Sequence, residues 1–164
     1  MSSYEGKNFF ETLGAFVPGY KGYKEKETRR DCDKILREAI AKRLLDRKPV
    51  IDQTIAKLTR AVQFDKVQEL NDLKVRIDAI VQQVKHAARG FSGFFDTVQV
   101  KEADLDRLYR YDLGLRDKVE QVHNLVGTLS GSTDVGGTVS QLQTALQELS
   151  EIVRHRDQAI TEVQ

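Results

Sequence analysis

The sequence predicts an all-α protein: an antiparallel helical bundle of two long helical hairpins (four main helices), preceded by a short N-terminal amphipathic helix. Apolar residues recur three or four positions apart along most of the chain, which is the period of an amphipathic helix. The composition, with 31% charged residues, 2 Pro and no Trp, is typical of long helices. Because the chain has 164 residues and 40% of them are hydrophobic, we expect 1–164 to form a single helical domain.

The N-terminal segment 4–17 predicts the short amphipathic helix, because its large apolar residues fall on one helical face. That face consists of Phe9, Phe10, Leu13, Phe16 and Val17. We expect it to dock on the bundle or on a second subunit. Insertion into a bilayer interface is the alternative, although helices that lie on membranes generally carry a more basic polar face than this one.

The first helix of the first hairpin is predicted over 24–63. Its apolar stripe runs from Leu36 to Val62 and keeps its helical phase across Pro49. Proline removes a backbone donor and disturbs a helix locally. We therefore interpret 24–63 as one long, kinked helix, with a break into two helices near Arg47 as the alternative.

The second helix of this hairpin is predicted over 65–89. Asp65 and Gln68 resemble a capping box at its start, and Gly90 is a stop signal at its end. The apolar stripes of this helix and of 24–63 match when facing residue numbers sum to about 128. The two helices should therefore fold back on each other.

The second hairpin is predicted over 101–129 and 138–163. Apolar residues in both segments alternate at steps of three and four, which indicates a heptad seam. The Gly- and Ser-rich segment 130–137 predicts the turn between them, and Thr138 with Gln141 resembles a second capping box.

Each seam of the second hairpin contains one charged residue. When the hairpin closes with facing residue numbers summing to 268, Asp112 lies opposite Arg156. We therefore predict a buried or half-buried structural ion pair, which sets the register more than it adds stability. The alternative is a slipped register in which Asp112 faces water.

Two segments rich in aromatic residues and glycine, 18–23 and 90–95, should lie at the same end of the bundle, because one helical hairpin separates them. Exposed rings flanked by basic residues would form a recognition patch for a partner. The alternative is that the rings pack on each other and close this end of the core. With the N-terminal apolar face, the hypothetical partner surface comprises Phe9, Phe10, Leu13, Phe16, Tyr20, Lys21, Tyr23, Lys24, Arg29, Arg30, Phe91, Phe94 and Phe95.

The sequence offers no catalytic, cofactor-binding or metal-binding constellation. Glu120 and His123 form the Glu-x-x-His step of di-iron bundles, but a second such step is missing. The single cysteine, Cys32, has no partner at the spacing of metal ligands, and no histidine belongs to a recognisable catalytic signature. Nucleic-acid binding is not expected, because the net charge is only +1 and no recognition motif is present.

These observations favour a non-enzymatic scaffold or adaptor that self-associates or binds a protein partner through its N-terminal helix and aromatic end. The alternative is a peripheral membrane-binding or membrane-remodelling protein. Segment 21–48 contains 11 Lys or Arg against 6 Asp or Glu, which would attract an anionic membrane. No apolar run reaches the roughly 18 to 20 residues needed to span a bilayer and no leader opens the chain, so we expect a cytoplasmic location.

Overall fold

The computed structural model describes residues 3–86 and 93–163, and all regular structure in these two ranges is helical. The predicted all-α helical bundle is therefore confirmed. The elements, in chain order, are α1 (Ser3–Phe16), α2 (Lys26–Leu45), α3 (Lys48–Arg60), α4 (Phe64–His86), α5 (Glu102–Thr128), the 3-10 turn η1 (Leu129–Gly131) and α6 (Val135–Glu162).

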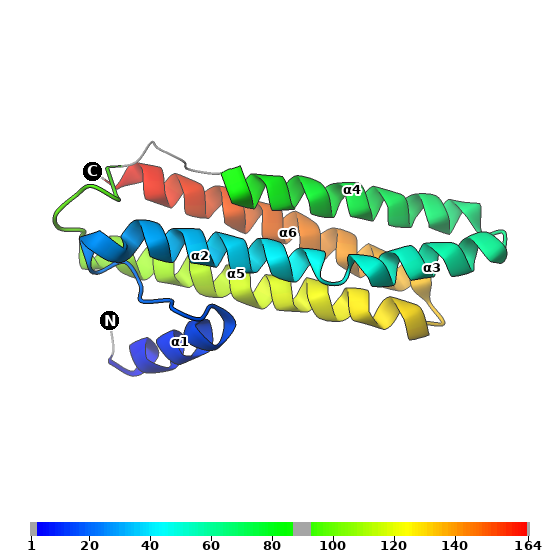
Figure 1. Cartoon of the computed structure of the whole chain (residues 1–164), viewed down its shortest axis with the longest axis horizontal. Helices are drawn as coiled ribbons and strands as arrows, with labels where there is room; N and C mark the ends of the chain where they lie inside the picture. The colour runs from blue at the N-terminus through cyan, green and yellow to red at the C-terminus, as the bar shows by residue number, and fades with distance from the viewer. Residues whose placement is uncertain (1–2, 87–92, 164) are drawn as a thin grey trace.

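The bundle consists of two antiparallel layers that pack face to face (Figure 1). Helices α2 and α3 run alongside α4, and α5 runs alongside α6. The layers meet where α4 packs on α6 and α2 packs on α5, while α1 lies outside against α5. The start of α1 and the end of α6 lie at one end, and the α3–α4 turn lies at the other, where it projects past the α5–α6 turn (Figure 1).

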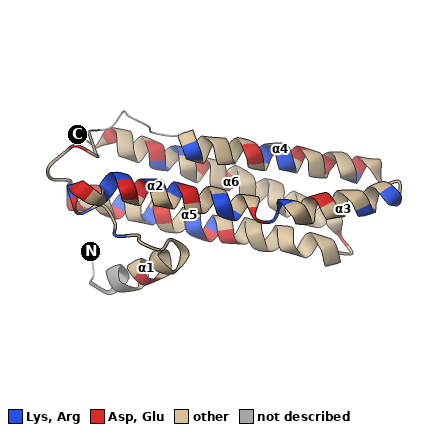
Figure 2. Ribbon diagram, viewed as in Figure 1, with Lys and Arg blue, Asp and Glu red and all other residues tan. Residues whose placement is uncertain are grey.

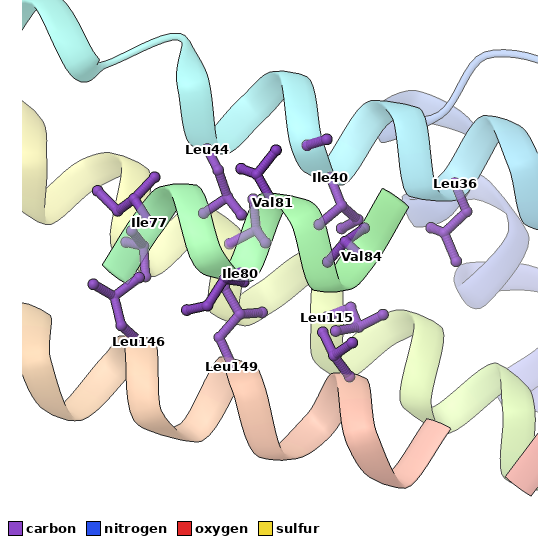
Figure 3. Close-up of a cluster of buried hydrophobic side chains, with 14 of the residues drawn as sticks. Leu36, Ile40, Leu44, Ile77, Ile80, Val81, Val84, Leu115, Leu146 and Leu149 are labelled. Carbon is purple, nitrogen blue, oxygen red and sulfur yellow. The ribbon is translucent and has the colours of Figure 1, made fainter. Parts of the chain in front are cut away.

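The core is a set of aliphatic side chains contributed by both layers. Figure 3 shows side chains of α2 and α4 interlocked above those of α5 and α6. Burial of each such side chain stabilises the fold by about 1.5–3 kcal/mol. The labelled members, all buried, are Leu36, Ile40, Leu44, Ile77, Ile80, Val81, Val84, Leu115, Leu146 and Leu149.

The single kinked helix predicted over 24–63 is wrong, and the alternative break is correct. Helix α2 ends at Leu45 and α3 begins at Lys48. Pro49 therefore lies in the first turn of α3, where a missing backbone donor removes no helical hydrogen bond. Ile51 is fully buried, so the apolar stripe keeps its phase across the break.

Both predicted capping boxes are also wrong. Helix α6 begins three residues before Thr138, because the side chain of Asp134 accepts a hydrogen bond from the Gly137 amide at 2.9 Å. Asp is a stronger N-cap than Thr, and the Thr138 hydroxyl instead donates to the Asp134 carbonyl at 3.1 Å. Helix α4 begins at Phe64, which puts Asp65 inside its first turn. The predicted stop at Gly90 lies outside the described residues.

Charged residues of both signs occur along the ribbons of α2 to α6 (Figure 2). Lys and Arg are interspersed with Asp and Glu along most of the bundle, whereas residues 121–128, the part of α5 nearest the α5–α6 turn, include none of these four residue types. None of the described helices is long and apolar enough to cross a membrane.

Candidate functional site

The polar centre of the bundle is the ion pair between α5 and α6. Nε of Arg156 donates a hydrogen bond to Oδ1 of Asp112 at 2.6 Å. The exposed fraction is 0% for Asp112 and 1% for Arg156, so both charges lie inside the core. The structure contains the pair that the register of the second hairpin predicts, in its buried form.

Two tyrosines from the aromatic segment 18–23 donate hydrogen bonds to the second carboxylate oxygen of Asp112. The hydroxyls of Tyr20 and Tyr23 donate to its Oδ2 at 2.6 and 2.5 Å. The segment approaches closely because Gly22 adopts a φ of +78°, and a Cβ there would lie 2.6 Å from the Tyr109 hydroxyl. The segment is thus an internal part of the bundle.

Asp33 of α2 extends the network beyond this pair. Nη1 of Arg156 lies 2.8 Å from Oδ1 of Asp33, and its Nη2 donates to the Tyr23 hydroxyl at 2.7 Å. Burial alone would raise the pKa of Asp33, but the charges of Arg156 and Arg37 outweigh it and hold this pKa below its ordinary value. Burial also raises the pKa of Tyr23 well above its ordinary value, although Arg156 opposes the shift. The tyrosine therefore remains a neutral hydrogen-bond donor.

Arg37 connects α2 with both α4 and α6. It donates to Asp33 at 2.9 Å, to the Val84 carbonyl at 3.0 Å and to Asp157 at 2.8 Å. Burial raises the pKa of Asp157 despite this arginine. The carboxylates and guanidinium groups of the network thus bind one another across the elements of the bundle.

Arg29 stabilises the same end of the bundle through backbone atoms. Its guanidinium is buried and donates to the carbonyls of Tyr23 at 2.7 Å, Phe94 at 3.0 Å and Thr97 at 2.5 Å. It therefore ties segment 18–23, through Tyr23, to the loop that follows residue 92. The prediction that Arg29 belongs to a partner surface is wrong, because its donors are directed inward.

The rings of the two aromatic segments pack on each other. Tyr23 stacks on Tyr109 with ring centroids 5.7 Å apart and contacts Phe94 edge-on at 5.6 Å, while Phe9 of α1 lies 5.0 Å from Tyr109. The prediction of an exposed recognition patch is therefore wrong for the residues that are buried. For these residues the alternative is correct: their side chains pack on each other and close this end of the core. These buried members are Phe9, Leu13, Tyr20, Tyr23, Arg29, Phe94 and Phe95.

The remaining predicted residues lie nearer the surface or outside the description. Phe16 is half-buried, and Arg30 is exposed, forming an ion pair with Asp96 at 3.1 Å. Phe91 lies outside the described residues. The exposed members of the predicted surface are Phe10, Lys21, Lys24 and Arg30.

Sequence reasoning missed Asp33, Arg37 and Tyr109 as members of the network. Asp33 and Arg37 lie one turn apart and in phase with the apolar stripe of α2, which is the signal that a charged residue points inward. Tyr109 precedes Asp112 by three positions and shares its helical face. Cys32 lies nearby, and burial raises the pKa of its thiol to about 11, so the thiolate is disfavoured.

The Glu-x-x-His step of α5 binds two arginines. Nε and Nη2 of Arg43 donate to the two carboxylate oxygens of Glu120 at 2.6 and 2.9 Å, and Nε of Arg47 donates to Nε2 of His123 at 3.2 Å. Among the described residues, no group of three or more His, Cys, Asp or Glu side chains could hold a metal ion. The step instead fastens the C-terminal end of α2 to α5.

This arrangement predicts a pH dependence of stability. Burial and the charges of Arg43 and Arg47 lower the pKa of His123 below its ordinary value of about 6.5. As pH falls below about 6.5, the unfolded chain binds this proton before the folded chain, so the free energy of unfolding should decrease. His123→Gln, which still accepts from Arg47, should weaken that decrease in urea titrations at several pH values. His155→Gln, which removes an exposed imidazole, is the control, and an equal effect of both changes would contradict the assignment.

The α3–α4 turn has an unusual backbone. The amide of Val62 donates to the Thr59 carbonyl at 3.1 Å, and that of Gln63 donates to the Leu58 carbonyl at 3.0 Å. This pair of bonds is a Schellman motif, whose left-handed position is normally a glycine. Val62 occupies that position with a φ of +59°, which is strained for a β-branched residue.

The same turn exposes two large apolar side chains. The exposed fraction is 68% for Val62 and 60% for Phe64. The apolar stripe of the sequence placed Val62 in the core, and this expectation is wrong because the left-handed residue ends α3.

No protein-family model, curated protein or solved structure matches the chain. Its function must therefore be inferred from its own geometry.

Proposed function

We propose that the protein is a non-enzymatic adaptor that binds a segment of a protein partner at its aromatic end. The proposal is carried by a groove of about 730 Å³ between α1, segment 18–25 and the start of α5. Its volume falls within the range of roughly 300–1,000 Å³ that is usual for binding sites.

The groove combines an apolar floor with a charged rim. Phe10, Val98, Leu105 and Tyr109 supply apolar or aromatic surface, and Val98 is among the most exposed large apolar residues described. The rim carries both signs of charge. Its charged members are Lys21, Lys24, Glu25, Glu102 and Asp106, with the buried Arg29 behind them.

This chemistry fits an amphipathic peptide segment. An apolar side chain of the partner would contact Phe10 and Val98, while its charged residues would pair with the mixed rim. Phe10, Lys21 and Lys24 also belong to the partner surface that the sequence predicts. A binding role is further supported by the polar network, whose acids and bases are engaged with one another inside the core.

A bilayer contact through α1 receives less support. Phe9 and Leu13 on its apolar face are buried, as is Val17 directly after it, so insertion would first require α1 to leave the bundle. The aromatic contacts of Phe9 with Tyr109 would be lost in that step.

Photo-crosslinking in cells tests the adaptor proposal. A photoreactive residue in place of Val98 should produce discrete protein adducts, because its side chain lies at the groove. The same residue in place of Val75, a similarly exposed position on α4, is the matched control. Adducts that appear at position 98 and disappear in the Lys21→Glu, Lys24→Glu double variant would support the proposal. Absence of adducts at position 98, or equal adducts at both positions, would overturn it.

A further inference from the structure

The α3–α4 turn contains a strained residue, Val62, at its left-handed position. The left-handed position of a Schellman motif accepts glycine or asparagine without strain, whereas valine is costly there. The side chain of Val62 is 68% exposed, so packing within the described chain does not offset that cost. Strained backbone positions of this kind cluster at functional sites.

Phe64 gives the turn a second apolar group beside Val62. Both side chains are largely exposed, and the turn projects beyond the α5–α6 turn, so a surface can approach it without meeting the rest of the bundle (Figure 1). We propose that this turn inserts Val62 and Phe64 into the interface of a lipid bilayer.

The size and shape of the apolar surface favour a bilayer over a second copy of the chain. Two side chains offer at most a few hundred Å² of apolar area, whereas a stable protein interface buries about 1,200–2,000 Å² in total. A convex turn also lacks the complementary flat face that an isologous dimer needs. A bilayer interface accepts isolated apolar side chains and requires no matching shape.

The charges around the turn agree with an anionic lipid surface. Lys57 and Arg60 lie in the last turn of α3, and Lys66 lies in the first turn of α4. Asp65 is the one acidic residue in segment 57–66, so the turn carries a net positive charge. Basic residues at this distance attract anionic headgroups and orient the turn toward them.

Vesicle binding of the full chain tests the inference. The wild-type protein should float with vesicles of phosphatidylcholine and phosphatidylserine, and Phe64→Ser should lower the partition coefficient by about tenfold, the loss expected for one inserted aromatic side chain. Val62→Asn should lower it by about fivefold, and Val75→Asn should leave it unchanged. A wild-type protein that does not bind, or a loss shared equally by the Val75 control, would overturn the proposal.

Two further readouts separate loss of binding from loss of folding. Val62→Asn and Val62→Gly should raise the melting midpoint, because both residues suit the left-handed conformation. The chain contains no Trp, so Phe64→Trp provides a single reporter whose emission should shift to the blue on vesicle addition, while Val75→Trp should not shift. A lower melting midpoint for Val62→Gly would refute the strain argument. A dimer in the absence of vesicles that Val62→Asn dissociates would assign the turn to self-association instead.

Discussion

Replacing Asp112 by alanine should lower the free energy of unfolding by about 4 kcal/mol, because it leaves Arg156 charged and buried. The same change removes the acceptor of the Tyr20 and Tyr23 hydroxyls, which are buried in the core. Urea unfolding followed by circular dichroism would measure the loss. A loss below about 1 kcal/mol would mean that the pair is not desolvated in solution.

The double variant Asp112→Leu, Arg156→Leu distinguishes an isolated pair from a network. For an isolated buried pair, two leucines cost little or even stabilise. Here the tyrosine hydroxyls would lose their acceptor and Asp33 would lose one of its two arginines. We therefore expect the double variant to remain destabilised by at least about 2 kcal/mol. Wild-type stability in this variant would contradict the network.

Replacing Arg29 by methionine should cost about 3 kcal/mol, because the carbonyls of Tyr23, Phe94 and Thr97 would lose a charged donor at once. Methionine preserves much of the apolar stem, so the loss reports the hydrogen bonds more than the packing. Hydrogen exchange should accelerate first in the amides of 93–97, which this side chain holds, and urea unfolding would give the overall loss.

Arg30→Met is the matched control for this experiment. Arg30 adjoins Arg29 in α2, but its ion pair with Asp96 is exposed on both sides, so the change should cost less than about 1 kcal/mol. Equal destabilisation by the two variants would show that Arg29 has no special role.

The helical bundle was predictable because its apolar stripes are regular over many turns. In α5 and α6 the regularity was strong enough to place Asp112 opposite Arg156 across a turn of unknown geometry. The break before Pro49 was harder to predict, because the stripe keeps its phase on both sides of it. A continuous helix and a short interruption therefore give the same pattern of apolar residues.

The aromatic end could not be derived from the sequence, because tyrosine suits both a surface and a core. Tyr20 and Tyr23 are inside because Asp112 accepts hydrogen bonds from their hydroxyls, and that acceptor lies about 90 positions further along the chain. The exposure of Val62 was hidden for a different reason. Periodicity reports the face of a helix, whereas the left-handed backbone of Val62 removes it from the helix.

The α3–α4 turn and the groove lie at opposite ends of the bundle, so the length of the helices fixes the distance between these two surfaces. From Lys26 to Arg60, α2 and α3 extend over about 50 Å at 1.5 Å per residue. A bundle bound to a bilayer by the turn would hold its peptide partner at about this fixed distance from the membrane surface. Adding seven residues to each of the long helical runs would lengthen the bundle, and with it this distance, by about 10 Å. The apolar stripes would keep facing one another, because seven residues are close to two helical turns.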